Sequence, residues 1–451
     1  MNGHSRGQAS GIERLYLDFD SFFATAEQHF NPALRGKPVG VVPLDSPHTR
    51  CIAVSREAKA LGVKSGATIV KARELVPDMI FVVARHDVYV RLHNRIIDVI
   101  ETCLPVANVR SIDEVVCHLL PCEAQEGIVL ADRIKRALAS SFSPVLTCSI
   151  GMAPTELLAK IGAEMNKPDG FALINASELP SKLAHLPLDD LPGISTGIET
   201  RLKAAGVEGF AALWELAPKQ ARGIWGNVEG ERFWNGLHGY HVERPETKKR
   251  MFGHSRMLPV DWRSPDKVRM CARQLAISAA RRLRRADVRA TKLTLGLRGG
   301  GYRGKTSSRK DDQRWEWEGS FQPARDDRTF LSVLSDGLHR SLQEVNFKPR
   351  SVSVMLHGLA GDGDITQDLF AAQIDGAHPS ASKQRQDHWE GISDLMDQLR
   401  SEHGPKALSL GPIDEVPGGY LGAKIAFGRI PDAEDFSGET VADEATHFCT
   451  V

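Results

Sequence analysis

LYLDFDSFFATAE, residues 15–27, joins a short apolar strand pattern to two acids and then to the start of a helix. Asp18 and Asp20 are one residue apart, so the two-residue period of a strand places them on one face. Two carboxylates on one face repel each other unless a cation lies beside them. A divalent metal with oxygen ligands is the usual solution. The alternative is a strand end that caps the next helix.

A second acid pair lies in SIDE, residues 111–114, inside the apolar run VRSIDEVVCHLL of residues 109–120. The run lacks the alternation of a half-buried strand and predicts a buried strand that carries Asp113 and Glu114. Because an unpaired buried charge is costly, such acids are seldom kept without a metal or a partner. The two acid pairs together therefore indicate a metal-dependent site.

Composition indicates an ordinary globular chain. Its 451 residues suggest about three or four domains, and 41% hydrophobic with 25% charged residues is typical of soluble globular proteins. Seven scattered cysteines without a CxxC pair predict reduced thiols and a cytoplasmic protein. Since no apolar run approaches about 18 residues and no export signal is visible, we expect a protein that is neither exported nor inserted in a membrane.

Charge is distributed unevenly, although the net charge is +0. Residues 245–360 hold 25 Lys and Arg against 12 Asp and Glu, whereas residues 361–451 hold 6 against 17. A basic block beside an acidic tail predicts a nucleic-acid-binding surface followed by an interaction segment. The alternative for the basic block is a solvated helix face, on which four arginines would lie: Arg281, Arg282, Arg284 and Arg285.

The first part of the chain predicts strand, insert, helix, strand, helix and strand over residues 15–153, an order that indicates an α/β domain with helices backing a mixed sheet. The helix of ELLAKIGAEMNKPDG, residues 156–170, ends near Pro168 and leaves Lys167 at its end. There Lys167 would reach a phosphate or complement the helix dipole. LPGISTGIETRLKAAGV, residues 191–207, predicts a Gly-bounded turn between helices whose backbone N–H groups contact DNA phosphates.

Residues 251–359 predict a second alternation of strand, long helix (265–286), two strands, helix (328–344) and strand. This order suits a four-stranded sheet with two helices on one face, and the other face would lie against DNA. Residues 361–382 are rich in Gly, Asp, Ser and Ala and predict a linker. A short helix is expected over about residues 389–403.

Four motifs closely resemble those of the Y-family translesion DNA polymerases: DFDSFFATAE (18–27), SIDE (111–114), SIGMAPTELLAKIGAEMNKPDG (149–170) and LPGI (191–194). The resemblance runs from residue 14 to about 360 and points to the ImpB/MucB/SamB group, which includes DNA polymerase IV and UmuC-like proteins. EAKALGVK (57–64) and SDLMDQLRSEHGPKALSL (393–410) look more like the polymerase V branch.

The resemblance implies an α+β multidomain fold shaped like a right hand. The α/β palm would comprise residues 1–29 and 80–175, the small fingers 30–79, and the helical thumb with its helix-hairpin-helix 176–243. A four-stranded α+β little finger that binds DNA would span 246–360. Residues 361–451 would form a linker and an acidic C-terminal segment.

The resemblance also implies a DNA-directed DNA polymerase that transfers nucleotides with two metal ions, Mg²⁺ or alternatively Mn²⁺. Low fidelity and no proofreading are expected, in translesion synthesis, DNA repair and the SOS response. Its partners would be primer-template DNA, deoxynucleoside triphosphates, a sliding clamp and accessory mutagenesis proteins, in the cytoplasm at the nucleoid. The alternative is a non-catalytic Y-family-like DNA-binding adaptor, against which the retained acids argue.

Residue roles follow from the same resemblance. Asp18, Asp113 and Glu114 would be the catalytic metal ligands, helped by the carbonyl of Phe19, whereas Asp20 matches a position that is not usually a ligand. The nucleotide would be contacted by six residues: Phe22, Phe23, Arg56, Lys59, Tyr89 and Lys167. Phe23 matches the steric gate under the sugar, and Tyr89 stacks near it. Arg56 stands where Tyr is common and Lys59 where Arg is common; Lys lacks the bidentate fork of Arg.

TQDLF, residues 366–370, resembles the short peptides that dock on the bacterial sliding clamp, with Thr366 in place of the leading Gln. Leu369 and Phe370 form an adjacent apolar pair in a polar segment, which is the kind of anchor that fills a pocket on a partner. The alternative is that the pair packs back onto the little finger.

Overall fold

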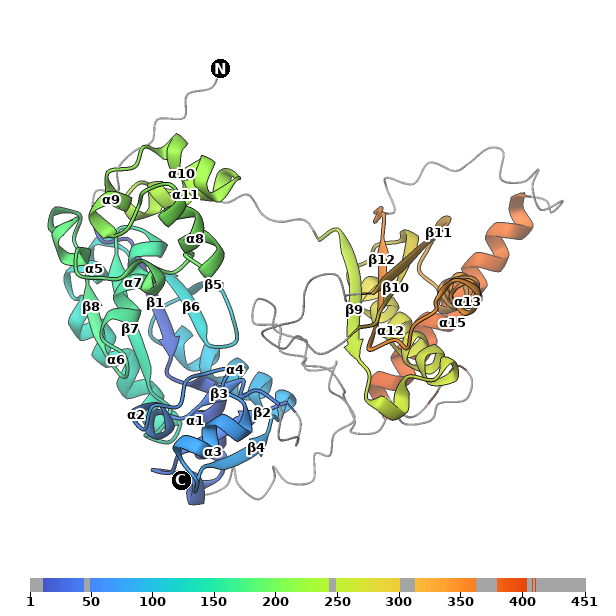
Figure 1. Cartoon of the computed structure of the whole chain (residues 1–451), viewed down its shortest axis with the longest axis horizontal. Helices are drawn as coiled ribbons and strands as arrows, with labels where there is room; N and C mark the ends of the chain where they lie inside the picture. Colours follow the sequence, from blue (N-terminus) through green and yellow to red (C-terminus); the bar gives the residue numbers. More distant parts are fainter. Residues whose placement is uncertain are drawn as a thin grey trace. The chain divides into compact units, whose positions relative to one another are not determined.

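The computed structural model describes residues 11–43, 49–242, 249–300, 313–361, 379–403, 408 and 410. These residues fall into two compact units, one on either side of residues 243–248 (Figure 1). The first unit holds a five-stranded and a three-stranded sheet and the second unit a four-stranded sheet, with separate apolar clusters, and we describe each unit by itself. No helix in the described ranges is long and apolar enough to cross a membrane.

The first unit is built on a five-stranded sheet in the order β5-β6-β1-β7-β8. Its strands are β1 (Arg14–Phe19), β5 (Val106–Val109), β6 (Glu114–His118), β7 (Cys148–Ala153) and β8 (Phe171–Leu173). Only β7 and β8 pair in parallel; the other neighbours are antiparallel. β1 lies in the middle, so the acids at its end are carried by the most enclosed strand. The predicted mixed sheet is confirmed.

Helices α1 (Phe22–Phe30), α4 (His86–Glu101), α5 (Pro121–Gln125), α6 (Gly127–Ser141) and α7 (Glu156–Met165) accompany this sheet. α7 packs on β7 and β1. The approach is very close, because a Cβ at Gly151 of β7 would lie 1.9 Å from the carbonyl oxygen of Ala159 in α7. Only glycine permits this spacing at that position. It fixes α7, and the polar side chains that α7 carries, against the central strand.

The insert after α1 forms a separate small layer. Its three-stranded sheet has the order β3-β2-β4, with β2 (Val39–Val42), β3 (Ala53–Val54) and β4 (Ile80–Val83). Two short helices, α2 (Arg56–Ala60) and α3 (Ile69–Leu75), complete it around an apolar cluster that includes Val54, Ile69 and Met79. β4 pairs with β2, so the sheet of the insert runs to Val83.

A helical segment closes the first unit. It begins with single turns at Ala176–Glu178, Ser181–Leu183 and Leu188–Asp190 and continues with α8 (Thr196–Ala204), α9 (Phe210–Trp214), α10 (Pro218–Trp225) and α11 (Val228–Leu237). Its apolar residues share one cluster with α7. The predicted Gly-bounded turn is present before α8, with Gly193 at φ +100°, but a single helical turn precedes it instead of a full helix.

The second unit has the predicted four-stranded sheet, in the order β11-β10-β12-β9. Its elements are β9 (Met251–Met257), a turn of helix at Val260–Trp262, α12 (Pro265–Arg285), β10 (Ala290–Arg298), β11 (Arg314–Ala324), α13 (Asp327–Glu344) and β12 (Ser351–His357). Val352, Val354 and Leu356 of β12 are buried and alternate with partly exposed residues. One face of the sheet therefore packs on α12 and α13 around a single core.

The C-terminal helix differs from its prediction. α15 runs over Pro379–His403, 25 residues, and packs against α13 (Figure 1). The predicted linker was too long, since residues 379–382 already belong to this helix, and the predicted short helix was about ten residues too short. The reason is physical: α15 is held by polar pairs, which the apolar periodicity used for prediction does not register.

Candidate active site

Antiparallel pairing brings the three predicted acids together. Asp18 on β1 is the register partner of Glu114 on β6, and the backbone N–H of Phe19 donates to the carbonyl oxygen of Asp113 at 2.9 Å. Asp18 is only 5% exposed. Asp113, however, lies in the turn between β5 and β6, so the prediction of one strand carrying both acids was wrong. The apolar run folds back on itself there, and the turn directs Asp113 beside the strand ends.

Lysines from the α7 region neutralise two of these acids. The Nζ of Lys167 donates to Asp18 Oδ1 at 2.6 Å and to Glu164 Oε1 at 2.9 Å. Lys160 on α7 forms an ion pair with Glu114. Lys160 was missed from the sequence, although it lies one helical turn after Glu156 and one before Glu164, a spacing that marks a charged face of α7.

Ser111 links Asp113 to Glu114. Its hydroxyl donates to Asp113 Oδ1 at 2.5 Å and also lies 3.3 Å from Glu114 Oε2. The two oxygens therefore share one small donor, which holds both side chains on the same side of the turn. Ser111 itself is buried.

Burial dominates the electrostatics of the site. It raises the pKa of Asp18 to about 8, although the ammonium of Lys167 opposes the shift. Burial also raises the pKa of Asp113. For Glu114 burial acts in the same direction, but the hydrogen bond and charge of Lys160 outweigh it and the pKa is lowered. Desolvated carboxylates this close to one another require positive charge.

A hard divalent cation suits this donor set. Within the described ranges, no three His, Cys, Asp or Glu side chains are arranged to hold a metal ion, since Lys167 and Lys160 each pair with one of the acids. The chemistry still fits, because Asp18, Asp113 and Glu114 offer only oxygen ligands and two of them resist ionisation without a cation.

Asp20 has a structural role. Its two carboxylate oxygens accept hydrogen bonds from the hydroxyls of Thr147 (2.8 Å) and Ser149 (3.0 Å) and from the backbone N–H of Asp169 (2.8 Å). The side chain is 3% exposed. Asp20 thereby fastens the end of β1 to β7 and to the loop after α7, a role distinct from that of Asp18.

The aromatic residues gather at the start of α1. The rings of Phe23 and Tyr89 lie 4.9 Å apart, and those of Phe22 and Phe23 lie 5.8 Å apart. Phe22 and Tyr89 are fully buried, and Phe23 is buried at 4% exposure. The structure thus brings together the three aromatic residues that the resemblance assigned to the nucleotide.

A buried carboxylate lies behind these rings. Tyr89 Oη donates to Glu27 Oε1 at 2.6 Å, and Arg85 donates to both oxygens of Glu27, at 3.1 and 2.7 Å. Glu27 is 2% exposed. Neither Glu27 nor Arg85 was predicted. The available signal was an acid one helical turn after Phe23, on the same helix face as that apolar ring, because an acid that is buried there needs a partner.

Two cations of the insert reach toward the site. Arg56, the first residue of α2, donates to Thr147 Oγ1 at 3.3 Å. Burial lowers the pKa of Lys59, and the nearby charge of Lys167 adds to that shift, so the two ammonium groups lie in one electrostatic field. The predicted clamp-binding residues Leu369 and Phe370 lie outside the described residues.

A surface pocket adjoins the acids. It is lined by Lys160 and Glu164 of α7 and by residues 189–195, the turn before α8. The same turn was predicted to contact DNA phosphates. Because Lys160 also pairs with Glu114, the pocket and the acid cluster share a residue.

The comparisons with known proteins agree with this geometry. Two family models match the chain: the impB/mucB/samB family over residues 17–164 and the impB/mucB/samB family C-terminal domain over residues 249–369. A DNA polymerase IV from Moorella thermoacetica is 29% identical over 89% of this chain and 96% of its own length. One from Pelotomaculum thermopropionicum is 32% identical over 65% of this chain and 71% of its own.

Solved structures resemble the chain in fold. A Y-family DNA polymerase chimera of Dbh and Dpo4 matches with a TM-score of 0.64 and 23% identity, over 78% of this chain and 100% of that one. An insertion ternary complex of Dbh DNA polymerase matches with a TM-score of 0.53 and 24% identity, again over 78% and 100%. These likenesses confirm the predicted α+β architecture with its C-terminal four-stranded sheet.

Proposed function

Since this chain belongs to the impB/mucB/samB family of Y-family DNA polymerases, we propose that its own acids, cations and aromatic rings carry out the family's reaction. The protein is a DNA-directed DNA polymerase that serves translesion synthesis. The reading as a non-catalytic adaptor is not favoured, because the curated relatives are named DNA polymerase IV. The observation that carries the proposal is the pairing of Asp18 opposite Glu114 with Asp113 beside them.

Asp18, Asp113 and Glu114, with the carbonyl of Phe19, are the residues that would hold divalent metal. Mg²⁺ is the ion we propose, with Mn²⁺ as its substitute. Two such ions, when bound, lower the barrier for attack of the primer 3′ hydroxyl on the α-phosphate and for departure of pyrophosphate. The chain's part is to hold three desolvated carboxylates in one place.

Cations around the acids bind the triphosphate in this proposal. Lys167 lies against Asp18 and in the field of Lys59, and Arg56 begins α2 nearby. A triphosphate carries charge that such groups attract, and Arg offers a bidentate fork to it. Phe23 serves as the steric gate, packed against Tyr89, and Phe22 lies beside it.

The primer-template duplex is the second substrate, and the domain assignment follows from it. We assign the five-stranded sheet to the palm, the insert to the fingers, the segment after residue 175 to the thumb, and the second unit to the little finger. The pocket beside Lys160 would receive a phosphate of the duplex on backbone N–H groups of the turn before α8. α2 and α3 have only five and seven residues, so few contacts cover the new pair and fidelity should be low.

Primer extension tests the proposal. Asp113→Ala combined with Glu114→Ala should abolish extension while DNA affinity stays near normal, because the acids act on charge that develops during transfer and the duplex is held by Lys and Arg. Glu126→Ala with Asp132→Ala, two exposed acids of the same sheet layer, is the matched control and should extend normally. Extension by the first variant would place the active site elsewhere.

We also propose two kinds of protein partner, a sliding clamp and accessory mutagenesis proteins. Leu369 and Phe370 would bind a sliding clamp, and accessory mutagenesis proteins would join at the damaged site. A polymerase that acts on chromosomal DNA works in the cytoplasm at the nucleoid. Replacing both residues by alanine should remove clamp-stimulated synthesis and leave clamp-free extension intact; a loss of thermal stability with clamp stimulation preserved would favour packing onto the second unit.

A further inference from the structure

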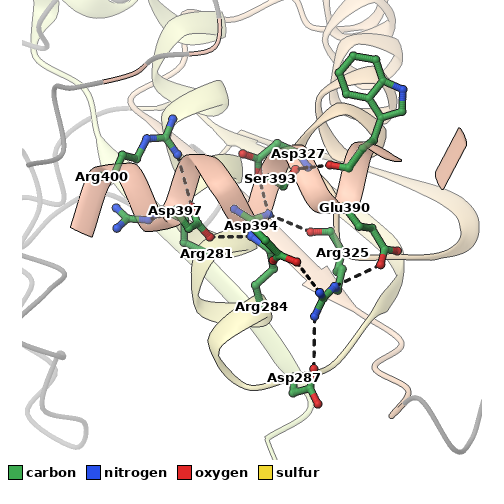
Figure 2. A network of polar contacts seen from close by, with 11 residues as sticks. Arg281, Arg284, Asp287, Arg325, Asp327, Glu390, Ser393, Asp394, Asp397 and Arg400 are labelled. Atoms are coloured by element: carbon green, nitrogen blue, oxygen red, sulfur yellow. Dashed lines mark hydrogen bonds and ion pairs between the residues drawn. The ribbon is translucent and has the colours of Figure 1, made fainter. Parts of the chain in front are cut away.

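The helix layer of the second unit carries four arginines that the basic-block prediction would have offered to DNA. They come from α12, from the segment before β10 and from the end of β11, and we call them the arginine face: Arg281, Arg284, Arg289 and Arg325. In the structure α15 covers this face, and Figure 2 shows its acids pointing toward Arg281, Arg284 and Arg325. Arg289 also pairs with an acid of α15. The arginine face is therefore not a bare DNA-binding surface.

Ion pairs hold the helix in place. Arg284 Nε lies 2.7 Å from Asp397 Oδ2, and Arg281 Nε lies 3.4 Å from Asp397 Oδ1. Arg325 reaches Asp394 at 2.6 Å and Glu390 at 3.2 Å, and Arg289 reaches the same Glu390 oxygen at 2.7 Å. Every arginine of the face thus contacts an acid of α15.

The covered charges balance. Within this network, five arginines (the arginine face and Arg400 of α15) meet five carboxylates: Asp287, Asp327, Glu390, Asp394 and Asp397. Arg284 is only 3% exposed at its side chain. Four residues of the network belong to α15: Glu390, Asp394, Asp397 and Arg400. Without them, four arginines remain against two aspartates, so the arginine face has a net positive charge.

Apolar packing contributes little to this contact. Among the described side chains of α15, Met396 is the one buried apolar residue, at 8% exposure. Trp389 lies over the guanidinium of Arg328, 4.4 Å from the ring centroid, and Ser393 accepts a hydrogen bond from the backbone N–H of Asp327. Paired charges roughly balance their own desolvation, and salt weakens those near the surface. The docking of α15 should therefore be weaker and more salt-sensitive than the apolar core beneath it.

We infer that α15 is a charge-held cover over the arginine face, and that this face binds the phosphate backbone of DNA once the helix is displaced. Arginine forks match phosphate oxygens as well as carboxylates, so acid and phosphate compete for the same groups. The inference uses the proposed function only to choose DNA as the polyanion.

The test compares two charge-matched variants of the full chain. The cover variant is Glu390→Gln, Asp394→Asn and Asp397→Asn; the control is Asp336→Asn, Asp387→Asn and Glu402→Gln, three exposed acids of α13 and α15 that take no part in the network. Binding of a short blunt duplex is measured across salt. The cover variant should bind the duplex more tightly. Its plot of log K against log salt should also be steeper, by roughly 2, because two further phosphates would each contribute about 0.9 to the slope. Identical curves for both variants would overturn the inference.

Hydrogen exchange on the wild-type protein provides a second test that needs no variant, in case the cover variant does not fold. Amides of residues 390–400 should exchange faster as salt rises or as duplex DNA is added, while those of β10 and β12 stay protected. Equal protection of α15 and the sheet under all conditions would show that the helix is a fixed part of the fold, and displacement by an acidic peptide but not by DNA would also overturn the inference. Neither readout depends on synthesis, so failure of the active-site proposal would be seen separately.

Discussion

At the scale of single residues, the carboxylate of Glu27 holds Tyr89 and Arg85 behind the ring of Phe23, the proposed steric gate. It accepts from Tyr89 and Arg85, and Tyr89 in turn packs on Phe23. A buried carboxylate with three charge-assisted or hydroxyl donors is well satisfied. The position of the Phe23 ring therefore depends on the hydrogen bonds that Glu27 makes behind Tyr89, as well as on apolar packing.

Phe23→Ala should admit ribonucleotides. In the proposed role the ring excludes a 2′ hydroxyl by overlap, so its loss should raise ribonucleotide insertion while deoxynucleotide insertion stays within about an order of magnitude. Single-nucleotide insertion assays with both sugars measure this. Phe330→Ala, at a fully buried ring of the second unit, controls for lost stability of about 3 to 5 kcal/mol. Unchanged sugar selectivity in the first variant would make Phe23 an ordinary core residue.

His29 should make the fold sensitive to acid. Burial lowers its pKa from 6.5 to about 4, and its Nδ1 accepts a hydrogen bond from the backbone N–H of Ser143, which protonation removes. Since the unfolded ring takes up a proton first, the stability from neutral His29 is present above pH 6.5 and is lost as pH falls toward 4.

Thermal melts between pH 7.5 and 4.5 check this expectation. His29→Asn should flatten part of the pH dependence, although it lowers stability at neutral pH. His185→Asn, at an exposed position outside this contact, is the matched control. A steeper profile in the His29 variant than in wild type would contradict the assignment.

At the scale of elements, the contact of α7 with β7 positions the cations of the site. α7 carries Lys160 and Glu164, and the chain leaves it toward Lys167, so a shift of this helix moves all three relative to Asp18. The helix lies as close as it does because Gly151 has no side chain.

Gly151→Ala should therefore lower both stability and activity. A Cβ there meets backbone atoms of α7 at 1.9 and 2.4 Å, which side-chain motion cannot relieve, and overpacking of this kind typically costs about 1 to 3 kcal/mol. Chemical denaturation and primer extension measure the two effects. Gly223→Ala in α10, where nothing lies within 4 Å, should be neutral or stabilising by up to about 1 kcal/mol. Equal behaviour of the two variants would show that α7 is not held by this contact.

The elements also show what sequence reasoning could reach. The order of strands and helices followed from the strand at Asp18, the run around Glu114 and the helix before Lys167, because local pattern indicates strands and helices; which strands pair was not predicted. The turn at Asp113 was missed because an apolar run gives no sign of folding back on itself. Lys160 and Glu27 were missed as partners because their contacts join segments far apart in the chain, which periodicity does not report.

At the scale of the whole molecule, the net charge of +0 is the sum of a basic block and an acidic segment, not of an even mixture. In the second unit, the acids of α15 pair with the arginine face, and we propose that DNA lies against the opposite face of the sheet. Arg298 on β10 and Arg314 on β11 are register partners and both are exposed. The helix layer and the sheet face should thus differ in their share of DNA binding.

Arg298→Gln with Arg314→Gln should reduce the salt dependence of DNA binding. Removing two phosphate contacts lowers the slope of log K against log salt by roughly 2, which titrations of primed duplex at several salt concentrations measure. Arg269→Gln with Arg340→Gln, two exposed arginines of α12 and α13, is the matched control and should change the slope little. A larger decrease of this slope in the control variant would indicate that DNA binds to the helix layer instead.

The pairing of α15 with the arginine face also bears on how fragments of this protein behave in purification. A fragment ending at residue 360 keeps 51 Lys and Arg against 40 Asp and Glu, a net charge of +11, and leaves the arginine face uncovered. Such a fragment would be retained on a cation exchanger that the whole chain passes through, and would carry cellular nucleic acid with it. The high apparent DNA affinity of such a fragment would then result from the truncation. The intact protein would bind DNA with far more selectivity.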